Sequence, residues 1–98
     1  MDDVEVRHDA TRRRFVAVVD GQEAYLEYSQ EGTVLDFTHT FVPPPLRGRG
    51  LAERVVRTGF EYARQQGMTV LPSCPYISGA FLRRYPEWQV VVDPSWDG

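Results

Sequence analysis

Three reactive side chains, those of His39, Cys74 and Tyr76, lie on either side of a glycine-rich stretch that also carries arginines. A histidine imidazole titrates near neutral pH and can act as a general base. A cysteine thiol becomes a nucleophile once it is deprotonated, and a tyrosine hydroxyl can donate a proton. The stretch between them is Arg47-Gly48-Arg49-Gly50-Leu51-Ala52. Its composition favours anion binding.

This stretch has the features of a phosphate-binding turn that leads into a helix. Gly48 and Gly50 lack a Cβ, so a bulky anion can approach the backbone closely. The first N–H groups of a helix have no intrahelical partner and carry partial positive charge. Neither a Rossmann fingerprint nor a P-loop is present, because the other glycines, the partner acid and a Gly-Lys-Ser/Thr are missing. The alternative is a plain turn with glycines for geometry and arginines for solubility.

The charge distribution also indicates a small anionic ligand. The chain has a net charge of −3, which argues against a general nucleic-acid binder. Residues 1–45 hold four Arg against nine Asp and Glu, a net of −5, whereas residues 46–57 hold four Arg against Glu53, a net of +3. Positive charge is therefore concentrated around the glycine-rich stretch.

Length and cysteine content limit the class of protein. The 98 residues allow one domain, over residues 1–98. Cys74 is the only cysteine, which excludes an intramolecular disulfide and suits a reducing compartment. The acidic N-terminus does not resemble a signal peptide, and no apolar run approaches the roughly 20 residues that span a bilayer. We therefore expect a cytoplasmic protein with no membrane association.

The elements before the turn are expected to be strands. Residues 4–8 alternate apolar and polar side chains, and residues 14–19 are rich in β-forming types. Asp20-Gly21 then predicts a tight hairpin to a return strand over 24–28. A long strand over 33–42 follows, which Pro43-Pro44-Pro45 stops because proline has no N–H for pairing. An antiparallel meander of up to four strands results.

Beyond the turn the period of the apolar pattern becomes helical. A helix is predicted over 51–64, with Gly67 placed to end it. A short strand over 69–71 should then lie parallel to strand 33–42, because a helix separates the two. Pro75 suits the first position of a last helix that runs to about Arg84, and residues 88–92 read as a final strand. The fold class is α+β: a meander, one βαβ unit and a short C-terminal helix.

At this point the sequence resembles the GNAT acyltransferases, which carry Arg/Gln-x-x-Gly-x-Gly/Ala between their fourth strand and the following helix. Arg47, Gly50 and Ala52 match that motif. The segments Thr38-His39-Thr40-Phe41-Val42-Pro43 and Val70-Leu71-Pro72-Ser73-Cys74-Pro75-Tyr76 further resemble a minimal, single-domain branch with a Cys-Pro-Tyr motif. The resemblance covers roughly residues 33–86. The two helices that usually follow the first GNAT strand, which help form the acceptor pocket, have no counterpart.

The resemblance implies a fold in which the two parallel strands splay apart in a V around the thioester of acetyl-CoA. It assigns the coenzyme A pyrophosphate to the turn, through Arg47, Gly48, Arg49, Gly50, Leu51 and Ala52. The pantetheine arm would pair with backbone near Phe41 and Val42, and Cys74 would lie beside the thioester. No metal is implied.

Each candidate catalytic residue has two interpretations. His39 is a general base, or a core residue that shares a face with Leu35, Phe37 and Phe41; a strand bulge would change that parity. Cys74 accepts the acetyl group, a role that a helix N-terminus favours, or lines the pocket. Tyr76, or else Tyr85, protonates the leaving thiolate, or simply packs. Arg83 and Arg84 reach the 3′-phosphate of the cofactor or form a solvated helix face.

The function that we expect is direct transfer of an acetyl group from acetyl-CoA to a primary amine of a small molecule or a protein. The alternative is a non-catalytic coenzyme A binder that acts as a sensor or interaction module. No nucleic-acid partner is expected. An exposed strand edge would allow a weak homodimer besides the monomer.

Overall fold

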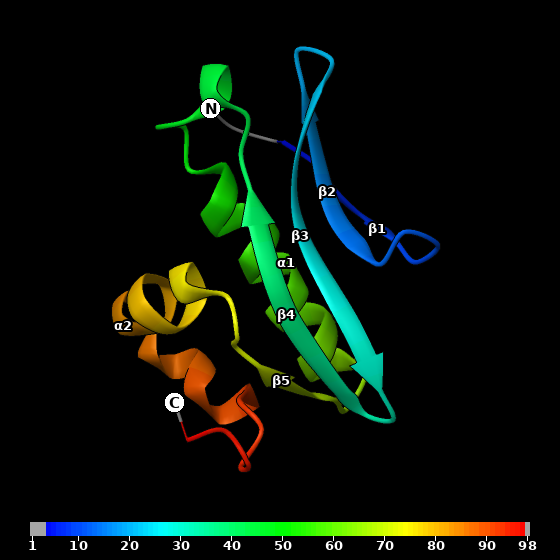
Figure 1. Cartoon of the computed structure of the whole chain (residues 1–98), viewed down its shortest axis with the longest axis vertical. Helices are drawn as coiled ribbons and strands as arrows, with labels where there is room; N and C mark the ends of the chain where they lie inside the picture. Colours follow the sequence, from blue (N-terminus) through cyan, green and yellow to red (C-terminus); the bar gives the residue numbers. More distant parts are fainter. Residues whose placement is uncertain (1–3, 98) are drawn as a thin grey trace.

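The computed structural model describes residues 4–97, which form a five-stranded sheet with helical segments packed on it (Figure 1). The strands follow one another in the sheet in chain order, and only the last pair is parallel. Their bounds are β1 Val6–Asp9, β2 Arg14–Val19, β3 Gln22–Glu31, β4 Val34–Phe41 and β5 Thr69–Leu71. The predicted meander, the parallel βαβ unit and the α+β class are confirmed.

The hairpin between β2 and β3 forms at the predicted dipeptide. Asp20 has φ 53° and Gly21 has φ 75°. Two successive positive φ angles are what a two-residue hairpin turn with the twist of a sheet requires. Local sequence is therefore enough to fix this connection.

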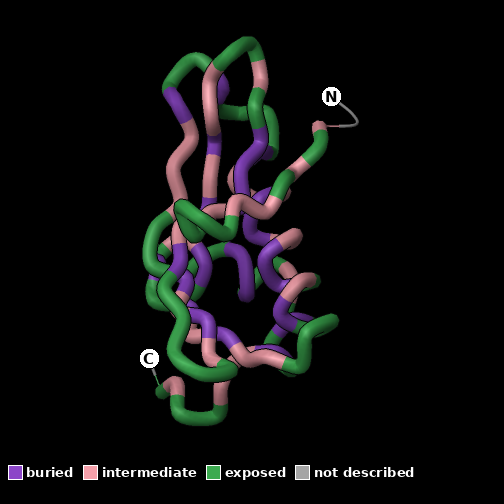
Figure 2. Tube along the Cα trace, turned by 90° about the vertical axis from the view of Figure 1, so that its right-hand side faces the viewer, coloured by how far each residue is buried: buried purple, intermediate pink, exposed green. Residues whose placement is uncertain are grey.

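The principal helix, α1, spans Leu51–Gln65 and covers one face of the sheet. Its apolar stripe is buried at Leu51, Val55, Val56, Phe60 and Ala63. The core continues around the Phe60 ring, which lies edge-on to Phe37 of β4 at 5.3 Å and stacks on Phe81 at 5.5 Å. Buried segments gather in the body of the molecule, while loop ends are mostly exposed (Figure 2).

A β-bulge in β4 decides which way its later side chains point. Tyr28 of β3 pairs with Phe37, but the preceding residue Glu27 pairs with His39, so Thr38 is an extra residue. The Thr38 hydroxyl donates to the Glu27 carbonyl oxygen at 3.1 Å. Leu35 and Phe37 are fully buried, whereas His39 is exposed on the opposite face. The assignment of His39 to the core face is wrong, and the bulge that would change its parity is confirmed.

Strands β4 and β5 pair only at one end. Their register covers Val34 to Asp36 against Thr69 to Leu71, after which β4 continues to Phe41 while β5 ends. The last backbone bond between the two segments runs from the Cys74 N–H to the Phe37 carbonyl oxygen at 2.9 Å. The strands therefore diverge beyond this point, as the predicted V requires.

The C-terminal helical segments differ from expectation in type. Residues 75–84 are helical throughout, as predicted, but Ile77–Phe81 (η2) is a π-helix, and only Leu82–Arg84 (α2) returns to α geometry. The strand predicted over 88–92 is wrong, because Pro86–Val91 forms the 3-10 helix η3. Trp88 turns inward and lies 5.8 Å from Phe60, so burial of its ring overrides the β-type pattern. A single parallel bridge between Val70 and Val92 remains.

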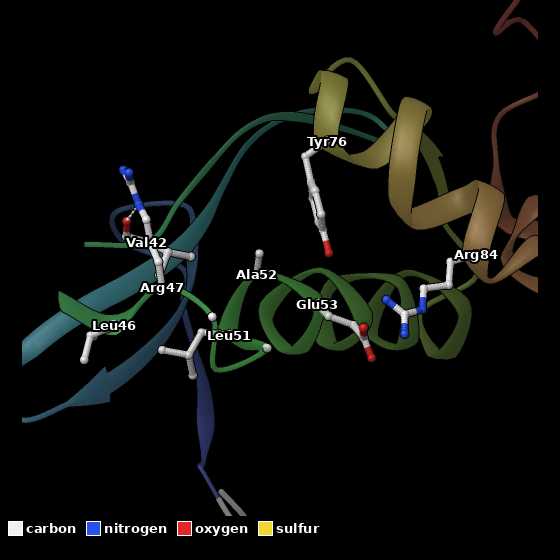
Figure 3. Close-up of a pocket in the computed structure, with 10 residues that line it drawn as sticks. Val42, Leu46, Arg47, Leu51, Ala52, Glu53, Tyr76 and Arg84 are labelled. Atoms are coloured by element: carbon white, nitrogen blue, oxygen red, sulfur yellow. Dashed lines mark hydrogen bonds between the residues drawn. The ribbon is translucent and has the colours of Figure 1, made fainter. Parts of the chain in front are cut away.

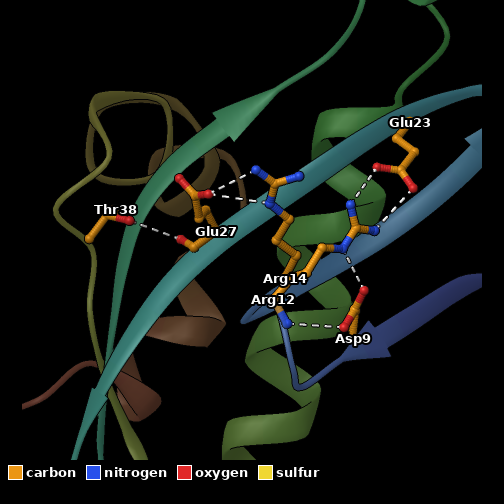
Figure 4. Close-up of polar contacts among 6 residues, drawn as sticks. All are labelled: Asp9, Arg12, Arg14, Glu23, Glu27 and Thr38. Atoms are coloured by element: carbon orange, nitrogen blue, oxygen red, sulfur yellow. Dashed lines mark hydrogen bonds and ion pairs between the residues drawn. The ribbon is translucent and has the colours of Figure 1, made fainter.

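The face of the sheet opposite α1 carries a network of ion pairs (Figure 4). Arg12 binds Asp9 at 2.7 Å and Glu23 at 3.0 Å, and Arg14 binds Glu27 at 3.1 Å. These pairs account for two of the arginines in the 12–14 run.

No helix within residues 4–97 is long and apolar enough to cross a membrane.

Candidate functional site

The chain between β4 and α1 is a tight turn that contains two left-handed glycines. Pro44–Leu46 forms the short 3-10 helix η1, and the Arg47 Nε–H donates to the Val42 carbonyl oxygen at 3.0 Å, which ties the turn to the end of β4. Gly48 has φ 84° and Gly50 has φ 77°, a region that side chains with a Cβ rarely adopt. No atom lies within 4 Å of an added Cβ at either glycine. The geometry thus leaves open space over the backbone.

Gly50 is the N-cap of α1 and supplies no side chain to cap the helix. The first backbone bond of the helix runs from the Arg54 N–H to the Gly50 carbonyl oxygen at 3.2 Å. The four preceding N–H groups, those of Gly50, Leu51, Ala52 and Glu53, have no partner in the helix, because the first four N–H groups of a helix are always left over. These donors and the positive end of the helix dipole favour an anion.

A pocket of about 400 Å³ opens over this turn (Figure 3). It is lined by the turn, by the first residues of α1 and by two residues of the C-terminal helical segment: Val42, Leu46, Arg47, Gly48, Gly50, Leu51, Ala52, Glu53, Tyr76 and Arg84. The turn is at one end, and Tyr76 and Arg84 lie toward the other (Figure 3). An elongated ligand with an anionic group at the turn fits this arrangement.

Glu53 places a carboxylate on the wall of the pocket, but its charge is held by two donors. Its Oε2 accepts a hydrogen bond from the Tyr85 hydroxyl at 2.8 Å and lies 3.4 Å from Arg57 Nη2. The guanidinium of Arg57 in turn sits over the Tyr85 ring, 4.5 Å from its centroid. The hydrogen bond to Glu53 raises the pKa of Tyr85.

Tyr76 projects from the C-terminal helical segment into the pocket (Figure 3). Burial, followed by the nearby negative charge of Glu53, raises the pKa of Tyr76 above that of a free tyrosine. The hydroxyl is therefore protonated at neutral pH and available as a proton donor. Tyr85, by contrast, already donates its proton to Glu53.

Cys74 and Thr40 meet where β4 and β5 diverge. The Cys74 Sγ is 3.4 Å from the Thr40 Oγ1, a hydrogen bond in which either atom could be the donor. Cys74 is 5% exposed and immediately precedes the helical segment that begins at Pro75. Its carbonyl oxygen accepts from the Ile77 N–H at 2.9 Å. The contact with Thr40 exists because the β4 bulge turns that residue toward the helical side.

His39 lies on the other face of the sheet. Its ring is 6.3 Å from Tyr25 in an edge-on arrangement, and Tyr25 is 5.6 Å from Phe41. These three rings form a half-exposed aromatic surface, which lies beside the point where the strands diverge. His39 therefore does not line the pocket that Tyr76 enters.

The structure brings most, but not all, of the sequence-predicted site residues to the pocket. The residues that line it are Val42, Arg47, Gly48, Gly50, Leu51, Ala52 and Tyr76, whereas Phe41, Arg49, His39 and Cys74 do not. Arg49 instead points toward the β2–β3 hairpin, with Nη1 3.7 Å from the Asp20 carboxylate. Sequence reasoning missed Leu46 and Glu53. An acidic residue in the first turn of a helix is a common pattern with no functional signal of its own.

Within residues 4–97, no group of three or more His, Cys, Asp or Glu side chains could hold a metal ion. The groups that the site does provide are the free N–H groups of the glycine turn, the Tyr76 hydroxyl and the Cys74 thiol in the gap between two parallel strands.

Comparison with known proteins identifies the family of this chain. The family model described as GCN5-related N-acetyl-transferase matches residues 14–91. The chain belongs to this family.

Individual relatives extend the match. The chain is 31% identical over 77 residues to Protein NATD1 of Gallus gallus, which covers 76% of this chain and 70% of that protein. It is 30% identical over 87 residues to Protein NATD1 of Danio rerio, with coverage of 86% and 78%. A GCN5-like protein from Staphylococcus aureus, solved by NMR, shares the fold with a TM-score of 0.70 at 21% identity. That comparison covers 95% of this chain and 91% of the other.

Proposed function

We propose that this protein transfers an acetyl group from acetyl-CoA directly to a primary amine. The observation that carries the proposal is the pocket over the glycine turn, where the uncapped N-terminus of α1 meets the end of β4. The family membership of the chain supports the reaction class. Acetyl-CoA supplies the activated thioester, and the residues of the chain bind and orient it and move the protons.

The turn fits the pyrophosphate of coenzyme A. Gly48 and Gly50 leave the backbone uncovered, and the N–H groups of Leu51 and Ala52 and the helix dipole attract the charge. Arg47 also lines the pocket, and its Nε–H is donated to the Val42 carbonyl oxygen. From this turn the pantetheine arm would follow the backbone of Phe41 and Val42 toward the gap between the diverging strands.

Proton transfer is assigned to two residues on opposite sides of that gap. Tyr76 would donate its hydroxyl proton to the departing thiolate as the carbon–sulfur bond breaks and the amine nitrogen bonds to the carbonyl carbon. His39, on the open face, would take the proton that the amine loses. This division places the cofactor and the acceptor on opposite faces of the sheet.

Cys74 is proposed to line the thioester end of the site rather than to carry the acetyl group. Its thiol is almost fully buried and is held by Thr40, an arrangement that suits a wall residue. Direct transfer needs no covalent enzyme intermediate. Intact-protein mass spectrometry after incubation with acetyl-CoA alone should then show no acetyl adduct.

A non-catalytic coenzyme A binder is the second candidate. Strands β1 and β2 are joined by a turn over 10–13 alone, so within residues 4–97 no helix between them encloses an acceptor on the open face. Such a protein would bind acetyl-CoA but would release no thiol when amines are added.

The test combines calorimetry and turnover. Gly50→Glu places bulk and negative charge at the N-cap, and Gly50→Gln is the matched control, because it adds nearly the same bulk and the same backbone strain without the charge. We expect acetyl-CoA to bind at least about tenfold more weakly to Gly50→Glu than to Gly50→Gln, a difference of about 1.4 kcal/mol. Wild-type affinity in Gly50→Glu would show that the cofactor binds elsewhere.

Turnover is then measured as free thiol released over a panel of primary amines. Thiol release that depends on an added amine supports the transferase. Binding of acetyl-CoA without amine-dependent release over the whole panel supports the second candidate.

A further inference from the structure

A second recess opens on the sheet face opposite α1, where β1 and β2 run side by side. Its volume is about 380 Å³, and it is lined by Glu5, Arg7, Val16 and Val18. Val16 is 6% exposed and forms an apolar base, whereas Val18 is 53% exposed. An apolar side chain can therefore be buried here, between a carboxylate and a guanidinium.

The strand register connects this recess to the aromatic surface that holds His39. Arg7, Val16, Tyr25 and Phe41 stand opposite one another across β1, β2, β3 and β4. Directly opposite residues of antiparallel strands project to the same face of a sheet. A continuous row of side chains thus crosses the open face from the recess to Phe41, and His39 is two positions before Phe41 on β4.

The neighbouring row on this face is already paired within the protein. It consists of Asp9, Arg14, Glu27 and His39. Arg14 Nη2 lies 3.1 Å from the Glu27 carboxylate (Figure 4), and its guanidinium lies 3.9 Å from the centroid of the Tyr25 ring. A ligand on the open face therefore does not have to neutralise Glu27, and apolar contact with the first row is left as its main attraction.

The distance between the two ends of the row indicates the size of the ligand. Neighbouring strands lie about 4.8 Å apart, so the recess is about 12–14 Å from β4. An extended peptide rises about 3.3 Å per residue, so four residues span about 13 Å, and side chains four positions apart point to the same side. Since no helix between β1 and β2 encloses this face within residues 4–97, a small amine at His39 would not reach the recess.

We propose that the acceptor is a lysine side chain in an extended segment of another protein, with an apolar side chain four positions away in the recess at Val16 and Val18. This inference rests on the proposed function, because the lysine amine is the primary amine that receives the acetyl group. Its nitrogen bonds to the carbonyl carbon as the carbon–sulfur bond breaks, and its proton goes to His39. The chain itself contains no lysine, so the acceptor belongs to a different protein.

The experiment measures acetyl transfer to peptides of Gly and Ser that carry one Lys and one Leu. In the test peptides Leu stands four positions before or after Lys. In the matched peptides it stands three positions away, where an extended chain turns it from the face. 2-Phenylethylamine serves as a small acceptor that could bind the aromatic surface alone.

We expect kcat/KM to be about tenfold higher for a four-position peptide than for its three-position control, which corresponds to about 1.4 kcal/mol. This is less than full burial of a leucine gives, because the recess is open on one side. The difference should lie in KM, since contact with the recess is the same in the bound substrate and in the transition state. Val18→Ser should remove most of the preference.

Val90→Ser is the matched control. Val90 is an 82% exposed valine on η3, outside the recess, so the same substitution there should keep the tenfold preference. Circular dichroism checks that both variants are folded. Binding is observed separately by NMR in the presence of coenzyme A, which has no acetyl group to transfer. The four-position peptide should shift the methyl resonances of Val16 and Val18 and leave those of Val90 unchanged.

Three kinetic results would overturn the inference and leave the proposed function intact: equal kcat/KM for the two Leu spacings, an equal loss of preference in Val90→Ser, or a higher kcat/KM for 2-phenylethylamine than for the peptides. Absence of transfer to every acceptor would overturn the proposed function and, with it, the role of the peptide as an acceptor. The methyl shifts would then still report whether the recess binds the peptide.

Discussion

Gly59 sets the distance between α1 and the sheet, and replacing it with alanine tests that packing directly. A Cβ built at Gly59 would lie 2.7 Å from Leu26 Cδ2 and 2.9 Å from Phe37 Cζ. Both distances are shorter than real Cβ contacts, and both neighbours are fully buried. The Leu26 methyl can move a little, but the Phe37 ring is held by Phe15 and Phe60. Helix α1 would therefore have to shift away from β3 and β4.

The magnitude follows from two opposing terms. Overpacking of a close-packed core costs about 1–3 kcal/mol, whereas replacing a helical glycine with alanine gains up to about 1 kcal/mol. Gly79 is the matched control, because it is also helical and no atom lies within 4 Å of its added Cβ. The helix-propensity term is similar in both variants. Gly59→Ala should therefore be about 1–3 kcal/mol less stable than Gly79→Ala.

The assay is equilibrium urea unfolding of both variants, with thermal unfolding as a second measurement. For a chain of this length, 1 kcal/mol corresponds to a shift in Tm of about 4–8 °C. If Gly59→Ala were as stable as Gly79→Ala, the close approach of α1 to Leu26 and Phe37 would be wrong. The position of the α1 N-terminus relative to β4, on which the pocket depends, would then need revision.

Two further predictions concern tyrosine and histidine side chains. Tyr76→Phe should lower kcat about 100-fold, the usual scale for loss of a general acid, with the Kd for acetyl-CoA unchanged; Tyr85→Phe is the control, and an equal loss of kcat there would contradict the assignment of Tyr76. The His8 ring stacks on the Phe15 ring with centroids 4.4 Å apart, and its Nε2 forms a hydrogen bond with the Tyr28 hydroxyl at 2.6 Å. Burial lowers the pKa of His8. Because the unfolded chain binds this proton more readily, the His8 contribution is fully present above about pH 6.5 and is lost as the pH falls below it. Urea unfolding at pH 5 and pH 7.5 should show a smaller change for His8→Gln than for wild type; an equal change would assign the pH dependence to other groups.

Much of the framework could be predicted because it depends on local rules. Asp20-Gly21 specified a hairpin, Pro43 ended a strand, and Gly50 marked the start of a helix. The prediction of a final strand was wrong because the structure there depends on contacts between distant residues. Residues 88–92 have a β-type composition, but the ring of Trp88 is buried against Phe60, and tertiary packing outweighed local preference.

The sequence by itself determined the glycine turn, the helix that follows it and the parallel strand on each side, since φ requirements, proline geometry and apolar periodicity are properties of neighbouring residues. Only the tertiary structure decided where the reactive side chains point. The extra residue at Thr38 turned His39 to the open face and Thr40 toward Cys74. The π-helix Ile77–Phe81 lies between Tyr76 and Arg84, and both residues line the pocket. An inserted residue of this kind is stabilised by packing between distant segments, so no local sequence pattern predicts it.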